Sequence, residues 1–171
     1  MKFARLLYLT LCASLFYPPL SSAEQATISV AQLNQSLTNT FPFSREYQGV
    51  SATFSAPAIV LKHLDNEIEI KVSIEVTYQE QRLLAKGLIK GKASLQPVTN
   101  TLRFEQPWLD EFFVQSDNMD DSQPALKIVK QTIGKTLPPM VLLDFEQVDV
   151  YLLNNQPSGF SLSPRGLIIE Y

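Results

Sequence analysis

The chain has 171 residues, of which 45% are hydrophobic and 18% are charged, and its formal net charge is −3. This composition excludes a disordered or collagen-like chain, and a single cysteine excludes a fold built on internal disulfides. The negative charge argues against nucleic-acid binding, which depends on neutralising phosphates, and against electrostatic attachment to anionic membrane surfaces.

Residues 1–23 have the features of a secretory signal peptide. A positively charged start precedes an apolar run over residues 6–17, and small residues at 21–23 suit a cleavage site. The apolar run is too short to span a bilayer, which requires roughly 20 helical residues. Cys12 lies in the middle of this run instead of at its end, so lipoprotein anchoring there is not expected. The sequence predicts export to the periplasm, no transmembrane span, and one mature domain over residues 24–171.

The mature chain begins with a helix signal. Ser29 and Gln32 have the spacing of a capping box, in which the two residues satisfy each other's free backbone N–H groups. Apolar residues then recur at helical spacing until Pro42. We predict a short amphipathic helix over residues 30–39 with its apolar side in the core. The apolar positions are Val30, Leu33, Leu37 and Phe41.

From residue 50 the hydrophobic period changes to two. Residues 50–55 alternate, Pro57 is expected to interrupt the strand, and an extended run resumes over residues 59–64. The strictest alternation covers residues 67–79 and predicts a long antiparallel strand with one buried and one solvated face. Strands of this length predict a large, twisted and curved sheet.

The next predicted strand has small residues on one face and lysines on the other. The small face contains Gly87, Gly91 and Ala93, and it leaves two alternatives open: a helix packs closely against it, or an empty volume there holds a ligand. The opposite face is interpreted as solvated, with Leu88 as its apolar exception. Its lysines are Lys86, Lys90 and Lys92.

Aromatic residues mark the following strand, which is expected to bend near Pro107. The acidic residues within 117–121 suit a helix N-terminus better than a calcium loop, which needs a glycine at its sixth position. A second helix is predicted to begin near Pro124 and to end at residues 138–139, and Gly134 is expected to mark a close contact. Its predicted buried stripe consists of Leu126, Val129, Ile133 and Leu137.

The rest of the chain is again predicted to be strand, over residues 141–145, 148–153, 160–163 and 167–169. The order helix, strands, helix, strands is typical of an α+β fold with helices on one face of an antiparallel sheet. We expect a long, strongly curved antiparallel β-sheet that wraps around or packs on one main α-helix, together with the short N-terminal helix.

The sequence contains no recognised catalytic motif. It lacks the glycine–serine elbow of hydrolases, a phosphate-binding glycine loop and a zinc-binding histidine motif. His63 is the only histidine, with no serine signature to act on. Carboxylate pairs such as Asp110 with Glu111, or Asp144 with Glu146, leave a hydrolase as the weakest alternative. We predict no catalytic residue, no metal and no cofactor, so the protein is not expected to be an enzyme.

Three segments resemble the YceB-like family of bacterial envelope proteins, a family named as a domain of unknown function. They are residues 27–37 (TISVAQLNQSL), 137–142 (LPPMVL) and 159–169 (GFSLSPRGLII). The resemblance covers nearly all of the mature chain and is most specific in the first segment. It implies a fold similar to the tubular lipid-binding superfamily, in which a curved sheet wraps a long helix and the groove between them holds acyl chains in several relatives. The family has no established catalytic residues to carry over.

Two functional hypotheses remain beside the hydrolase. The first is a periplasmic protein that binds a lipid or another apolar ligand in a groove between helix and sheet. Its site would consist of Leu33, Leu37, Ile70, Val72, Ile74, Gly87, Ile89, Gly91, Ala93, Val129, Ile133 and Leu137. The second is an envelope interaction or scaffolding module without a ligand. Its protein partner would bind an apolar patch of Trp108, Phe112 and Phe113.

Overall fold

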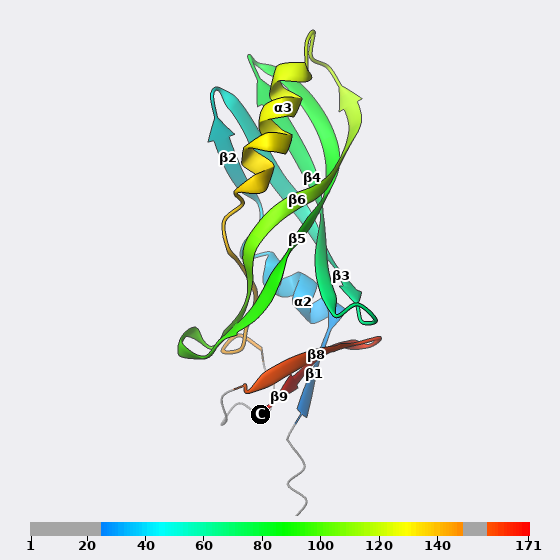
Figure 1. The fold of residues 1–171 in the computed structure, drawn as a ribbon, viewed down its shortest axis with the longest axis vertical. Helices are drawn as coiled ribbons and strands as arrows, with labels where there is room; N and C mark the ends of the chain where they lie inside the picture. Colours follow the sequence, from blue (N-terminus) through cyan, green and yellow to red (C-terminus); the bar gives the residue numbers. More distant parts are fainter. Residues whose placement is uncertain (1–24, 149–156) are drawn as a thin grey trace, which may run out of the picture.

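The computed structural model describes residues 25–148 and 157–171. The expected signal peptide over residues 1–23 and most of the expected strand over residues 148–153 lie outside the described residues. The described part is elongated, with a large curved sheet along most of its length and a small sheet at one end (Figure 1).

The larger sheet has six strands in the order β2-β3-β4-β5-β6-β7, and all neighbouring pairs are antiparallel. Strand β4 confirms the prediction from strict alternation, because apolar and polar side chains face opposite sides of an extended chain. The strands are β2 (Phe43–Tyr47), β3 (Val50–Lys62), β4 (Glu67–Tyr78), β5 (Gln81–Gln96), β6 (Thr101–Asp117) and β7 (Met140–Asp144).

The larger sheet curls strongly, as its long strands predicted. Helix α2 (Val30–Leu37) contacts both β3 and β7, which lie near opposite edges of the sheet. The edge strand β2 also reaches across the curl, because the Arg45 guanidinium donates a hydrogen bond to the Thr136 carbonyl at 3.3 Å. The two helices lie on the enclosed side of the sheet (Figure 1).

The smaller sheet joins the two ends of the described chain. Strand β9 (Gly166–Glu170) lies in the centre, between β1 (Gln25–Ser29) and β8 (Gly159–Ser163). Both pairings are antiparallel. Strands β8 and β9 confirm the two short strands predicted near the end of the sequence.

The capping box at the start of α2 is confirmed. The Gln32 N–H donates to Ser29 Oγ at 3.3 Å, and the Ser29 N–H donates to Gln32 Oε1 at 2.9 Å. The helix ends at Leu37, two residues before the predicted end. Its buried residues are Leu33 and Leu37, which face the core as predicted.

The second predicted helix is shorter than expected. Helix α3 (Gln123–Gln131) ends before Thr132, whose φ of −123° and ψ of −69° are not helical, and residues Ile133–Lys135 form the 3₁₀-helix η3. Another 3₁₀-helix, η2 (Pro97–Thr99), joins β5 to β6. Since α2 has 8 residues and α3 has 9, the expected distinction between one main helix and a short N-terminal helix is not confirmed.

Pro57 interrupts the strand pairing, as predicted, but it does not divide the strand in two. Strand β3 continues through it by a β-bulge, seen as a shift of register between Ser55 and Ala58. Within this bulge Ala56 has a φ of +48°, which is uncommon for a residue with a side chain. Proline is tolerated at such a position because the bulged residue makes no ladder hydrogen bond.

The core lies between the helices and one face of the larger sheet, which we call the inner face. Buried residues of α3, including Val129, belong to one cluster with alternate residues of β4. The opposite face is called the outer face. On β4 the inner residues are Ile70, Val72 and Ile74, and the outer residues are Glu69, Lys71 and Ser73.

Candidate functional site

The structure places the residues of the predicted helix–sheet groove in the core. Ten of these twelve positions are buried, whereas Gly91 and Ala93 are half-buried. Leu33 and Leu37 come from α2, and Val129 comes from α3, so both helices contribute to the same apolar interior. The fold brings the predicted groove residues together, and they pack against one another in the core.

Side chains occupy the space beside the glycines of this interior. A Cβ atom built at Gly87 would lie 2.6 Å from both Ile74 Cδ1 and Leu109 Cδ1. A Cβ atom at Gly134 would lie 2.8 Å from Leu109 Cβ, which confirms the close contact predicted there. At Gly91 the ring of Phe104 would lie 3.2 Å away. The neighbours of Gly87 and Gly91 belong to strands β4 and β6, not to a helix as one alternative expected, and Gly91 also lines a hollow of about 400 Å³ together with Ala93.

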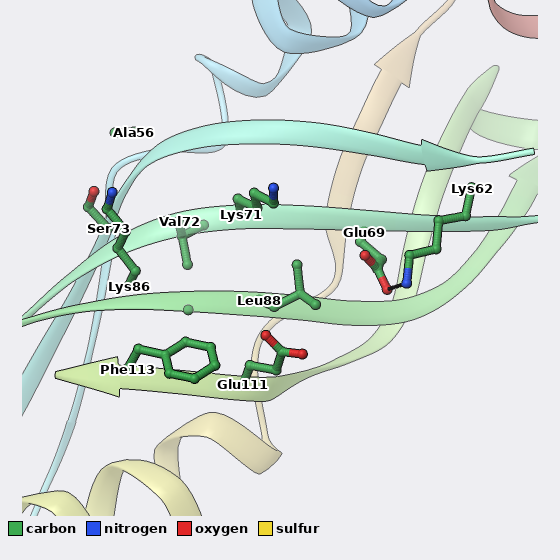
Figure 2. A pocket seen from close by; sticks show the side chains of 11 residues that line it. Ala56, Lys62, Glu69, Lys71, Val72, Ser73, Lys86, Leu88, Glu111 and Phe113 are labelled. Carbon is green, nitrogen blue, oxygen red and sulfur yellow. Dashed lines mark ion pairs between the residues drawn. The ribbon is translucent and has the colours of Figure 1, made fainter. Parts of the chain in front are cut away.

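A hollow lies on the outer face, and we call it the outer groove. It has a volume of about 600 Å³ and crosses strands β3 to β6. Figure 2 shows its side chains projecting from the four strands. The lining residues are Ala56, Lys62, Glu69, Lys71, Val72, Ser73, Lys86, Gly87, Leu88, Glu111 and Phe113.

Bulges on both sides of the groove account for its position. The bulge of β3 leaves Ala56 between Ser55 and Ala58 at one wall. On the other side the pairing of β5 with β6 shifts register between Leu88 and Ile89. A bulge bends its strand and increases the local twist, so the face between two bent strands becomes concave.

The apolar part of the groove comes from Leu88 and Phe113. Leu88 points to the outer face, opposite Glu111 on β6, yet it is only 8% exposed. Phe113 lies opposite Lys86 and is 62% exposed. An apolar floor and an exposed aromatic wall are the surfaces that an apolar ligand group would cover.

Three charged side chains in the groove are free. Among residues 25–148 and 157–171, Lys71, Lys86 and Glu111 make no ion pair or side-chain hydrogen bond. Lys71 and Glu111 both lie opposite Leu88, on the two strands that flank β5. Leu88 therefore stands between these two opposite charges.

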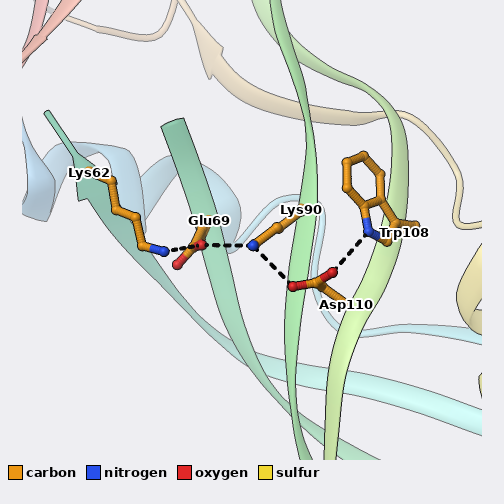
Figure 3. Close-up of polar contacts among 5 residues, drawn as sticks. All are labelled: Lys62, Glu69, Lys90, Trp108 and Asp110. Carbon is orange, nitrogen blue, oxygen red and sulfur yellow. Dashed lines mark hydrogen bonds and ion pairs between the residues drawn. The ribbon is translucent and has the colours of Figure 1, made fainter. Parts of the chain in front are cut away.

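A network of ion pairs lies beside the groove on the same face (Figure 3). Glu69 is 3% exposed, and its Oε1 lies 2.6 Å from Lys62 Nζ and 3.5 Å from Lys90 Nζ. Lys90 Nζ also lies 3.0 Å from Asp110 Oδ2, and the Trp108 indole N–H donates to Asp110 Oδ1 at 3.4 Å. The network links four adjacent strands, and its carboxylates compensate the positive charges of both lysines.

The network shifts three pKa values. The hydrogen bond to Glu69 raises the pKa of Lys62, and the hydrogen bond to Asp110 raises the pKa of Lys90. The same contact with Lys90, assisted by the hydrogen bond from Trp108, lowers the pKa of Asp110. Each of the three shifts favours the charged form of its own group.

The predicted aromatic patch is divided between the two faces. Trp108 and Phe113 are exposed on the outer face, at 42% and 62%. Phe112 packs against the core and lies under the Lys130 ammonium, 5.6 Å from the ring centroid. Phe112 therefore does not belong to an exposed patch with the other two residues.

One member of each carboxylate pair named from the sequence has a structural contact. Asp110 belongs to the ion-pair network, and Asp144 closes a turn by accepting hydrogen bonds from the Glu146 N–H at 3.0 Å and Gln147 Nε2 at 2.8 Å. His63 lies exposed in the turn between β3 and β4. In the part of the chain that the structure describes, no group of three His, Cys, Asp or Glu side chains is arranged to hold a metal ion.

Sequence reasoning missed the outer groove because its residues look like an ordinary solvated strand face. Lys86 belongs to the face that the sequence predicts to be solvated, and Lys71 belongs to the polar positions of a strictly alternating strand. The available signal was Leu88, the one apolar residue among the lysines of β5. An apolar residue at an outward position indicates an apolar surface within an otherwise polar face.

No protein-family model matches the chain, and no curated protein is significantly similar to it. Neither of the two described helices has the length and apolar character needed to cross a membrane.

Proposed function

We propose that the protein is exported and binds a lipid or another apolar ligand in the outer groove. The observation that carries this proposal is the combination of Leu88 and Phe113 in a concavity of about 600 Å³. Ligand sites are typically concave, with volumes of roughly 300–1,000 Å³ and a few polar groups around apolar walls. The resemblance to a lipid-binding superfamily supports the ligand class but not the position, which is on the opposite side of the sheet from that family's groove.

The ligand proposal is tested by filling the groove. Leu88→Trp places a large side chain in the concavity, whereas Leu84→Trp is a matched control on the same strand, where Leu84 is 39% exposed and does not line the groove. Binding of the fluorescent amphiphile 11-(dansylamino)undecanoate is titrated by fluorescence. We expect Leu88→Trp to weaken binding at least tenfold and Leu84→Trp to leave it unchanged. Equal affinities for both variants would contradict the site.

Export is tested separately. The full chain is expressed in a Gram-negative host, the periplasm is released by osmotic shock, and the mass of the intact protein is measured. We expect a chain that begins at Glu24 in the periplasmic fraction. A full-length chain in the cytoplasm would contradict export, without bearing on the groove.

A second candidate function is an envelope interaction module. It is favoured by the exposure of Trp108 and Phe113 on the outer face, at 42% and 62%. Aromatic residues of this kind often anchor protein–protein interfaces. A photocrosslinking amino acid placed at Trp108 in living cells should then give a discrete crosslinked band. The same amino acid at Val98, which is 98% exposed and lies in η2 outside the patch, should not. Identical patterns at both positions would count against this function.

A further inference from the structure

We infer that the ligand of the outer groove is an anionic amphiphile with one apolar chain, whose headgroup is held by Lys71 and Lys86. This inference rests on the proposed function, because it names the ligand class of the same groove. It is carried by three features of the described residues: the placement of two free lysines, the balance of charge in the groove, and the apolar surface beside each lysine.

The two lysines are diagonal neighbours across β4 and β5. Lys71 lies opposite Leu88, and Lys86 lies opposite Ser73, so all four residues share the outer face. Diagonal neighbours in a sheet are separated by about 7–8 Å, within reach of long side chains. Figure 2 shows the Lys86 side chain extending across β4 toward Ser73. Two cations on the same face repel each other, and a bound anion reduces that repulsion.

The charges of the groove leave one positive charge uncompensated. Lys62 is paired with Glu69, and the neighbouring Lys90 is paired with Asp110. Of the free groups, Lys71 and Lys86 are cations and Glu111 is the single anion. The groove is therefore locally positive, although the chain has a formal net charge of −3. A ligand with one negative charge matches this balance.

Each lysine is next to an apolar residue. Lys71 lies opposite Leu88, and Lys86 lies opposite Phe113. A headgroup between the two ammonium groups would thus place its chain on Leu88 and Phe113 in the middle of the groove. The stems of the lysines add further apolar surface, because long cationic side chains keep their methylene groups against apolar neighbours.

The experiment compares three amphiphiles that share a dodecyl chain: dodecanoate, dodecyl maltoside and dodecyltrimethylammonium. Each is titrated into the protein by calorimetry below its critical micelle concentration. We expect dodecanoate to bind at least tenfold more tightly than the neutral and cationic compounds. Its affinity should fall as salt rises, since screening weakens exposed charge pairs, whereas the affinity of dodecyl maltoside should not.

Substitutions then test whether the two lysines bind the headgroup. Lys71→Gln and Lys86→Gln should each lower the affinity for dodecanoate about three- to tenfold without changing the affinity for dodecyl maltoside. Glu111→Gln should raise the affinity for dodecanoate. Lys92→Gln is the matched control, because Lys92 is an exposed lysine of β5 that does not line the groove. Equal binding of the three compounds, or affinities unaffected by both lysine variants, would overturn the headgroup assignment and leave the proposed function standing. Absence of binding by all three would overturn both.

Discussion

Phe112 and Phe113 are adjacent in β6 and lie on opposite faces of the sheet. Phe112 packs against the core under the Lys130 ammonium, whereas Phe113 is 62% exposed beside the outer groove. One strand therefore contributes both to the interior and to the candidate binding surface. Substitutions at the two positions separate these contributions.

Phe112→Ala should lower the free energy of unfolding by about 2 kcal/mol, less than the roughly 3–5 kcal/mol of a fully buried phenylalanine. Phe113→Ala should change it by less than about 0.5 kcal/mol, as is usual for an exposed residue, and should weaken ligand binding instead. Urea denaturation and the fluorescence titration measure the two effects. Equal losses of stability would show that the two rings do not differ in burial.

Gly87→Ala should destabilise the fold, because the added methyl group would meet Ile74 and Leu109 at 2.6 Å. Overpacking of this kind costs about 1–3 kcal/mol. Gly159→Ala is the control: its Cβ would lie 2.9 Å from Glu170 Oε2, at the end of a side chain that can move aside. Thermal denaturation compares the stabilities of the Gly87→Ala and Gly159→Ala variants. A Gly87→Ala variant as stable as the wild type would mean that the interior has room beside this strand.

Acid should remove the stabilisation that Asp110 provides. Because Lys90 lowers the pKa of Asp110 in the folded state, its contribution is fully present above the unfolded pKa of about 3.9. The contribution is lost as pH falls through the lower folded pKa. Lys90→Gln should raise the pKa of Asp110, measured by NMR titration of the carboxyl carbon, and Lys92→Gln should not. An unchanged value in Lys90→Gln would contradict the ion pair.

Ser29→Ala should lower the free energy of unfolding by about 1 kcal/mol, since it removes the side-chain cap of α2. Ser36→Ala lies within the same helix and has no side-chain hydrogen bond to lose, and alanine is the better helix former. It should leave stability unchanged or slightly higher. Chemical denaturation of the two variants measures how much the cap contributes to the free energy of unfolding. Equal results would show that the capping box does not stabilise the domain.

Local patterns predicted the elements that local interactions determine. The alternation of β4 and the capping box of α2 depend on residues a few positions apart, so both could be recognised in the sequence. The end of α3 could not, because it coincides with a tertiary contact: Gly134 packs against Leu109, which lies on a different element. The helical spacing of Ile133 and Leu137 continues past the point where the helix stops.

The outer groove could be predicted least of all. Its shape depends on where the pairing of β3 with β4 and of β5 with β6 shifts register. Pro57 indicated an irregularity in β3, but not that the strand would continue through it. The lysines of β5 could be assigned to a face correctly, yet the compensation of Lys90 depends on Glu69 of β4 and Asp110 of β6. Leu88 indicated only an apolar position within that face.

The smaller sheet couples the two ends of the described chain. Gln25 pairs with Glu170 and Ser29 with Gly166, so β1 cannot find its neighbour until β9 has been synthesised. Contacts between such distant segments form late, because a long loop must close first. A chain terminated at Arg165 would lose the central strand and leave both β1 and β8 unpaired. Truncation at one end would thus open the other end to proteolysis.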